Sequence, residues 1–182
     1  MSRQHGFSLI ELLIVVAIIL IIAAIAVPNL IRSRMAANEA SAVSSLRTIG
    51  DANVLYFSFF GVGFAGELEQ LGPPSGGCAT VSPQCADLLD MAISGVNPNT
   101  DTPVKNGYRF RYETDEEDPT PAEPNGAYSV VAIPTAPGSS GVSTFCRDHT
   151  NIILKDTSGS QTNSEEDGCA EDWPVGGNIG PL

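Results

Sequence analysis

An apolar run near the start of the chain is its most constraining feature. From Phe7 to Ile31 the only ionisable side chain is Glu11, and residues 12–27 are all apolar. As a single helix, this run would extend about 37 Å at 1.5 Å per residue, which is enough to cross a hydrocarbon core of about 30 Å. The rest of the chain is rich in Gly, Pro, Ser, Thr and Asn. The sequence therefore predicts one membrane-competent helix joined to a polar, loop-rich domain.

Two simple explanations of the run are a cleaved secretory signal and a plain transmembrane anchor. Arg3 precedes the run, and Ala24-Ile25-Ala26 fits the small-x-small pattern of a signal peptidase site. An uncleaved anchor would explain the length, although Arg32 and Arg34 after the run leave its orientation open. Neither explains Glu11, because a carboxylate inside a membrane helix costs about 2.5–3.5 kcal/mol on insertion scales.

The order of residues around Glu11 supports a third explanation. The string Gly6-Phe7-Ser8-Leu9-Ile10-Glu11-Leu12 resembles the processing signature of type IV prepilins and type II secretion pseudopilins. The resemblance continues through Ala-Ile-Ala-Val-Pro-Asn-Leu at residues 24–30. It implies that prepilin peptidase removes residues 1–6 by cutting after Gly6, and that Phe7 becomes the N-methylated terminus. It also implies that the apolar helix is kept, first as an anchor and then as the core of a filament.

Glu11 has a physical role in such a filament. Cleavage after Gly6 leaves a positive amino group on Phe7, and both this group and the Glu11 carboxylate are costly in an apolar medium when unpaired. When helices bundle, Glu11 of one subunit can meet the Phe7 amino group of a neighbour. We expect this pair to set the axial register, as buried polar residues do in coiled coils.

The helix is expected to continue beyond the membrane. Pro28 removes one backbone hydrogen bond, so we expect a kink or local melting around residues 24–28. Residues 32–55 lack proline and are rich in helix formers, and Gly61 marks the end. The domains expected are thus the leader 1–6, a helix 7–60 with a transmembrane part 7–31, and a globular head 61–182. A stripe of Val43, Leu46, Ile49 and Phe57 should face the head.

Four cysteines follow the apolar run and predict two disulfides in an oxidising compartment. Three pairings are open. The pairs Cys78–Cys85 and Cys146–Cys169 are favoured because each closes a local loop rich in turn residues.

Short strands separated by turn residues indicate an antiparallel sheet in the head. Residues 108–112 alternate, with Arg109 and Arg111 outward, residues 128–133 form a second strand, and residues 151–154, together with 143–146, a third. Short helices are expected at residues 66–71 and 85–93. The fold class is α+β, and the family resemblance implies the pilin-like ladle, a long helix packed on a small sheet.

Catalytic, cofactor and nucleic-acid functions find little support. No nucleophile, phosphate-binding or metalloprotease motif is present, and the formal net charge of −12 opposes nucleic-acid binding. We expect no cofactor and no catalytic residue. Ca²⁺ is the one alternative, because carboxylates cluster in the acidic segment 113–124 and again at Glu165-Glu166-Asp167 with Glu171-Asp172. The segment after Asp156 is not an EF-hand loop, since Gln161 stands where glycine is required.

The sequence therefore predicts a structural pilin subunit. Its expected partners are prepilin peptidase, the inner-membrane assembly machinery, the membrane before assembly, and copies of itself in a cell-surface helical polymer. A secretion pseudopilin is the first alternative. A soluble domain released after Ala26 by an ordinary signal peptidase is a distant second.

Overall fold

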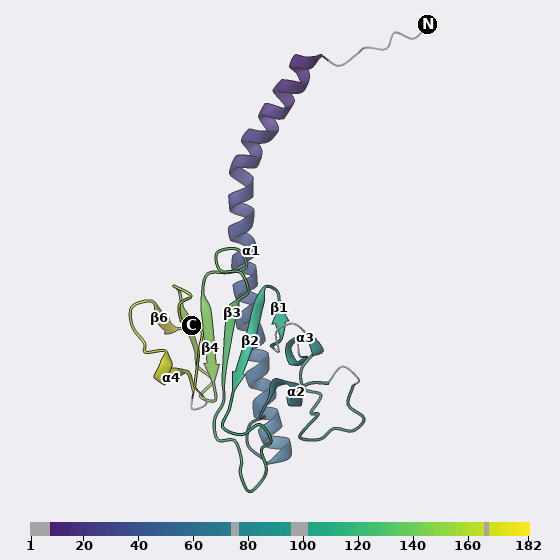
Figure 1. The fold of residues 1–182 in the computed structure, drawn as a ribbon, viewed down its shortest axis with the longest axis vertical. Helices are drawn as coiled ribbons and strands as arrows, with labels where there is room; N and C mark the ends of the chain where they lie inside the picture. The colour runs from purple at the N-terminus through teal and green to yellow at the C-terminus, as the bar shows by residue number, and fades with distance from the viewer. Residues whose placement is uncertain (1–7, 74–76, 96–101, 166–167) are drawn as a thin grey trace. The chain divides into compact units, whose positions relative to one another are not determined.

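The computed structural model describes residues 8–73, 77–95, 102–165 and 168–182 (Figure 1). The chain divides into two compact units, Met1–Arg34 and Met35–Leu182. The first unit is helical where it is described, and the second holds the sheet and the core.

Helix α1, Leu9–Phe60, has 52 residues. It begins after Ser8, whose carbonyl accepts from the N–H groups of Glu11 and Leu12, and it ends at Gly61, which has a φ of +64°. A left-handed φ of this kind favours glycine at a helix end. The end predicted at Phe60 is confirmed. The chain is helical at and around Pro28, so it does not melt there; the kink stays a prediction.

A six-stranded antiparallel meander follows the chain order β1-β2-β3-β4-β5-β6. The strands are β1 Val104–Lys105, β2 Tyr108–Glu113, β3 Ser129–Pro134, β4 Thr144–Asp148, β5 Ile153–Asp156 and β6 Ile179–Pro181. The α+β class and the strands at β2 and β3 are confirmed, with Arg109 and Arg111 exposed. The expected third strand is two strands, β4 and β5, which pair with Cys146 opposite Leu154. The short strands β1 and β6 were not expected.

One face of the sheet packs against the second half of α1 (Figure 1). The buried apolar side chains of the helix are Ala42, Leu46, Ile49, Ala52 and Tyr56, and they share one core with Tyr108, Phe110, Val130, Ala132 and Phe145. The predicted stripe is right for Leu46 and Ile49. It is wrong for Phe57, which is 50% exposed because it lies about 100° round the helix from Tyr56.

The other face of the sheet is covered by the C-terminal segment. Val131, Ile133 and Leu154 form a second cluster with Trp173, whose indole Nε1 donates to the Asn163 carbonyl at 2.7 Å. A disulfide joins Cys146 on β4 to Cys169 at the start of the short helix α4, Cys169–Asp172. The sheet is thus covered on both faces, which explains why all six residues of β3 are buried.

Two short helices precede the sheet, α2 Leu68–Leu71 and α3 Met91–Ser94. The first was predicted. The helix predicted over residues 85–93 is wrong except at its end, because the N–H groups of Ala86, Leu88 and Leu89 donate to carbonyls of α2 instead. Asp90 caps α3 by accepting from the N–H of Ala92 at 2.9 Å. The second disulfide, Cys78–Cys85, closes a turn just before this segment.

Candidate assembly site

The first unit presents an uninterrupted apolar surface. Its large apolar side chains, from Leu9 to Ile31, are between 44% and 80% exposed. Among the described residues, α1 is the one helix long and apolar enough to cross a membrane. Soluble monomers rarely expose an apolar patch of this extent, and such patches are typical of membrane or protein contacts.

Glu11 lies in the first turn of α1, at the end of this surface. The N–H of Ser8 donates to its Oε2 over 3.5 Å, a long contact in which an acidic side chain is placed favourably at a helix start. No cation among the described residues forms an ion pair with Glu11. The predicted cleavage and methylation residues, Gly6 and Phe7, lie outside the described residues.

Polar side chains further along this unit bond within the helix. The Asn29 amide donates to the Ile25 carbonyl at 3.2 Å, and the Ser33 hydroxyl donates to the Asn29 carbonyl at 3.0 Å. Pro28 has no N–H to donate to the Ala24 carbonyl, so one helical bond is missing at this point. The Asn29 and Ser33 side chains at the end of the apolar surface thus have their hydrogen bonds within the helix.

In the second unit, Glu39 joins α1 to the sheet. Its Oε1 accepts from the N–H groups of Val142 and Ser143 at 3.0 and 3.1 Å, and its Oε2 lies 3.5 Å from Lys155 Nζ. Burial raises the pKa of the Glu39 carboxyl, but the two backbone donors and Lys155 outweigh burial and lower it. The carboxylate thus holds the helix to the residues around the start of β4.

Arg147 on β4 makes the second connection. Its side chain is 7% exposed, and its Nη1 donates to the helix carbonyls of Leu46 and Arg47 at 2.9 and 2.7 Å. Its Nη2 donates to Asn151 Oδ1 at 2.6 Å. The guanidinium lies where a side chain on Gly50 would be, since a Cβ there would be 2.1 Å from Arg147 Cζ. The lack of a side chain at Gly50 lets the cation reach the helix backbone.

Asn53 makes the third connection, from inside the core. Its Oδ1 accepts from the Ala65 N–H at 3.2 Å and from the Tyr112 hydroxyl at 2.9 Å, and its amide donates to the Ile49 carbonyl. Burial is the main cause that raises the pKa of Tyr112. Sequence reasoning missed the roles of Glu39, Arg147 and Asn53. Two signals were present in the sequence: Gly50 inside the helix, where Arg147 approaches, and Asn53, a polar residue that interrupts the apolar stripe.

The aromatic residues at the end of α1 divide into two groups. Tyr56, Phe60 and Phe64 pack in the head, with ring centroids 4.9 Å apart in the pairs Tyr56–Phe60 and Phe64–Tyr128. His149 lies beside Phe64 at 6.5 Å, in a packing position. Phe57 and Phe59 are 50% and 71% exposed, and the Phe57 ring also contacts Phe64, with the ring centroids 5.4 Å apart.

The acidic segments show no assembled metal site where they are described. No three His, Cys, Asp or Glu side chains gather within reach of one ion in that part of the chain. Glu166, Asp167 and the side chain of Glu171 lie outside the described residues.

Asp156 is buried and already satisfied by its own loop. Its Oδ1 accepts from the N–H and hydroxyl of Ser158, and its Oδ2 accepts from the N–H groups of Ser160 and Gln161. Burial raises the pKa of Asp156, but these donors outweigh it and lower the pKa to about 2. The loop after β5 thus surrounds the Asp156 carboxylate with hydrogen-bond donors, whereas a cation site would provide further oxygen ligands.

Comparison with known proteins places this architecture. The prokaryotic N-terminal methylation motif family matches residues 1–27, which include Gly6, Phe7 and Glu11. The type IV major pilin protein PilA of Myxococcus xanthus is 28% identical over 194 residues, covering 96% of this chain and 80% of PilA. Over most of its length the chain is thus similar to a type IV major pilin.

A second relative matches this chain only in part. The type IV wide pilus major component PilA4 of Thermus thermophilus is 56% identical over 39 residues, which cover 21% of this chain and 30% of PilA4. No solved structure matches the chain significantly. Both named relatives are pilus components, and the long helix on an antiparallel sheet is the pilin-like fold predicted from the sequence.

Proposed function

We propose that this pilin is cut after Gly6 by prepilin peptidase, N-methylated at Phe7, held in the inner membrane by residues 7–31, and polymerised into a type IV pilus on the cell surface. The observation that carries the proposal is the apolar surface of residues 9–31, whose large side chains are exposed along its whole length. In the membrane this surface contacts lipid, and in the filament it contacts the same segment of other copies.

The energetics favour such a polymer. Burial of apolar surface contributes roughly 25 cal/mol per Å², so each helix gains a large driving force along its whole length. Contacts between different faces of identical subunits do not close, and therefore build a helical fibre. Pairing of Glu11 with the Phe7 amino group of a neighbour removes two unpaired charges from an apolar core and selects one axial register.

Two observations favour a retained helix and a pilus. Residues 24–26, the site expected for signal peptidase, lie inside α1 rather than in an exposed linker. The pilin relative aligned over most of this chain is a major pilus subunit. The secretion pseudopilus gains no comparable support.

The intact mass and N-terminal residue of the native protein test the proposal. We expect a methylated Phe7 terminus in the sheared surface fraction, with the mass lowered further by the hydrogens lost in two disulfides. A terminus at Val27 would mean ordinary signal cleavage and would end the polymer proposal. A methylated Phe7 found only in the membrane fraction would instead argue for a filament that does not reach the surface.

A further inference from the structure

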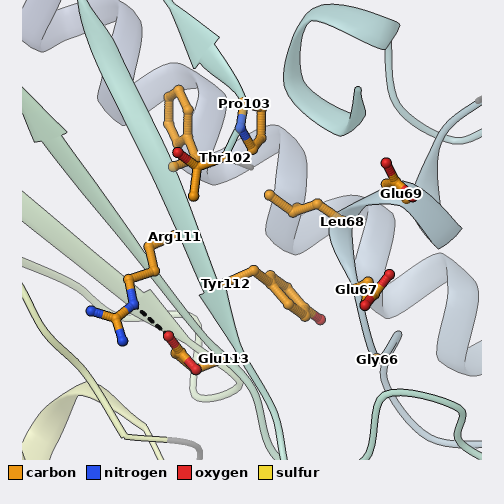
Figure 2. A pocket seen from close by; sticks show the side chains of 10 residues that line it. Gly66, Glu67, Leu68, Glu69, Thr102, Pro103, Arg111, Tyr112 and Glu113 are labelled. Atoms are coloured by element: carbon orange, nitrogen blue, oxygen red, sulfur yellow. Dashed lines mark hydrogen bonds and ion pairs between the residues drawn. The ribbon is translucent and has the colours of Figure 1, made fainter. Parts of the chain in front are cut away.

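A groove of about 490 Å³ opens on the head between the segment around α2 and strand β2 (Figure 2). Its floor is apolar and its rim carries carboxylates. We call it the acidic groove; the floor consists of Leu68, Pro103 and Phe110, and the rim includes Glu67, Glu69 and Glu113.

The head neutralises only part of this rim. Among the described residues, Arg111 is the one cation that lines the groove; it pairs with Glu113 (Figure 2) and also donates to Asn163 Oδ1. Glu67 and Glu69 are exposed and form no ion pair among the described residues. Burial and repulsion from Glu69, Glu117 and Asp118 raise the pKa of the Glu67 carboxyl. The acidic groove is therefore a recess with an apolar floor in which Glu67 and Glu69 have no matching cation among the described residues.

The same chain carries two cations without a matching acid. Arg32 and Arg34 are exposed, and no ion pair reaches them within the described residues. The positions three and four residues away on either side hold no acid. Arg47 differs, because it lines a second groove together with Asp51, an acid that pairs with Arg147 at 3.6 Å.

We infer that, in the filament, the acidic groove of one pilin receives Arg32 and Arg34 of a second copy. Guanidinium groups suit it, because their planar fork binds carboxylates with two parallel hydrogen bonds and they are more weakly hydrated than ammonium groups. The apolar floor would take the side-chain stems. Because complementary charge fixes which surfaces meet, this contact would help to select the neighbour and the register of each head. The inference rests on the proposed polymer, which supplies the second copy.

Charge reversal in the full-length protein tests the pairing. We expect Glu67→Lys with Glu69→Lys, and separately Arg32→Glu with Arg34→Glu, each to lower the filament yield by about tenfold or more, since like charges across an interface oppose association. Combining all four substitutions should restore most of the yield. The matched control is Glu123→Lys with Glu165→Lys, which makes the same charge change at exposed acids outside the groove and should leave the yield unchanged.

Cross-linking gives a readout that does not depend on yield. Both native disulfides are closed and no free cysteine is present, so only introduced thiols react. In filaments carrying Glu69→Cys with Arg34→Cys, a copper–phenanthroline oxidant should remove two hydrogens per thiol pair and join neighbouring subunits into a ladder. Subunits from filaments that carry Glu123→Cys with Arg34→Cys should not be cross-linked and should run as monomers on the same gel.

The outcomes separate the two proposals. Absence of filaments from the unmodified pilin would overturn the proposed function. Normal filaments from Glu67→Lys with Glu69→Lys, together with no ladder from the groove cysteine pair, would overturn the acidic groove contact and leave the polymer intact.

Discussion

Replacing Gly50 by alanine tests how the head holds its helix. On helix propensity alone, the change should stabilise α1 by about 0.8–1.0 kcal/mol. The new Cβ, however, would lie 2.1 Å from Arg147 Cζ and 2.4 Å from both Nε and Nη2. The guanidinium must move, and it then loses its bonds to the carbonyls of Leu46 and Arg47.

The magnitude follows from these two opposing effects. A hydrogen bond from a charged group contributes about 1.5–3 kcal/mol, so losing two costs about 3–6 kcal/mol before relaxation. The displaced cation still lines a groove together with Asn151 and Asp51, which recovers part of the loss. After the propensity gain, we expect a net destabilisation of about 2–4 kcal/mol. For a head of this size, this lowers Tm by about 5–15 °C.

The assay is thermal unfolding of the full-length pilin in detergent, followed by near-UV circular dichroism of the buried Trp173. The control is Thr48→Ala, at an exposed position of the same helix, where the change raises helix propensity and removes only an exposed hydrogen bond to the Ser44 carbonyl, so Tm should change little. In an Arg147→Met background, Gly50→Ala should cost much less than in the native chain. A higher Tm for Gly50→Ala alone would refute the reasoning, because it would show that the Arg147 side chain can move away without loss of stability.

Three further predictions concern other parts of the pilin. Glu11→Ala should leave synthesis and membrane insertion intact but abolish or scramble assembly, seen as pilin in the membrane fraction without sheared filaments; normal filaments would contradict its assigned role. The low pKa of Asp156, about 2 against an ordinary 3.8, contributes stability that is present above pH about 4 and lost as the pH falls towards 2. In Asp156→Asn, the urea midpoint of unfolding should therefore fall less steeply as the pH is lowered. An unchanged pH dependence would contradict this contribution of Asp156. Replacing both Cys146 and Cys169 by serine should lower the unfolding free energy by about 3.5 kcal/mol in urea, and a change near zero would mean that Trp173 packing alone holds the segment.

The parts of the fold that depend on local pattern could be predicted from the sequence. The end of α1 at Phe60 follows from the glycine after it, and β2 follows from strict alternation with outward arginines. The short helix predicted over residues 85–93 failed because α2 carbonyls take its backbone donors, and that competition involves residues separated in the chain. Local propensity does not reveal such partners.

The polar connections between helix and sheet were beyond reach for the same reason. Arg147 bonds to carbonyls about a hundred residues earlier, and Glu39 accepts from N–H groups as far along the chain. A single sequence shows that these residues are polar, but it does not show which backbone groups they meet. The N-terminal segment, residues 6–31, was the opposite case, because its ordered motif and its apolar run lie within one stretch of chain.

The order of the strands has a consequence for how the head folds. Because each strand pairs with the next one along the chain, every hairpin can close as soon as its second strand is available, and both disulfides join cysteines at most 23 residues apart. Short loop closures of this kind are entropically cheap and fast. Docking of α1 is different, since the hydrogen bond from Arg147 to the Leu46 carbonyl cannot form before the fourth strand is in place. We therefore expect the strands to pair in order from one edge of the sheet to the other. Docking of α1 onto the sheet should be the slow, late step of folding.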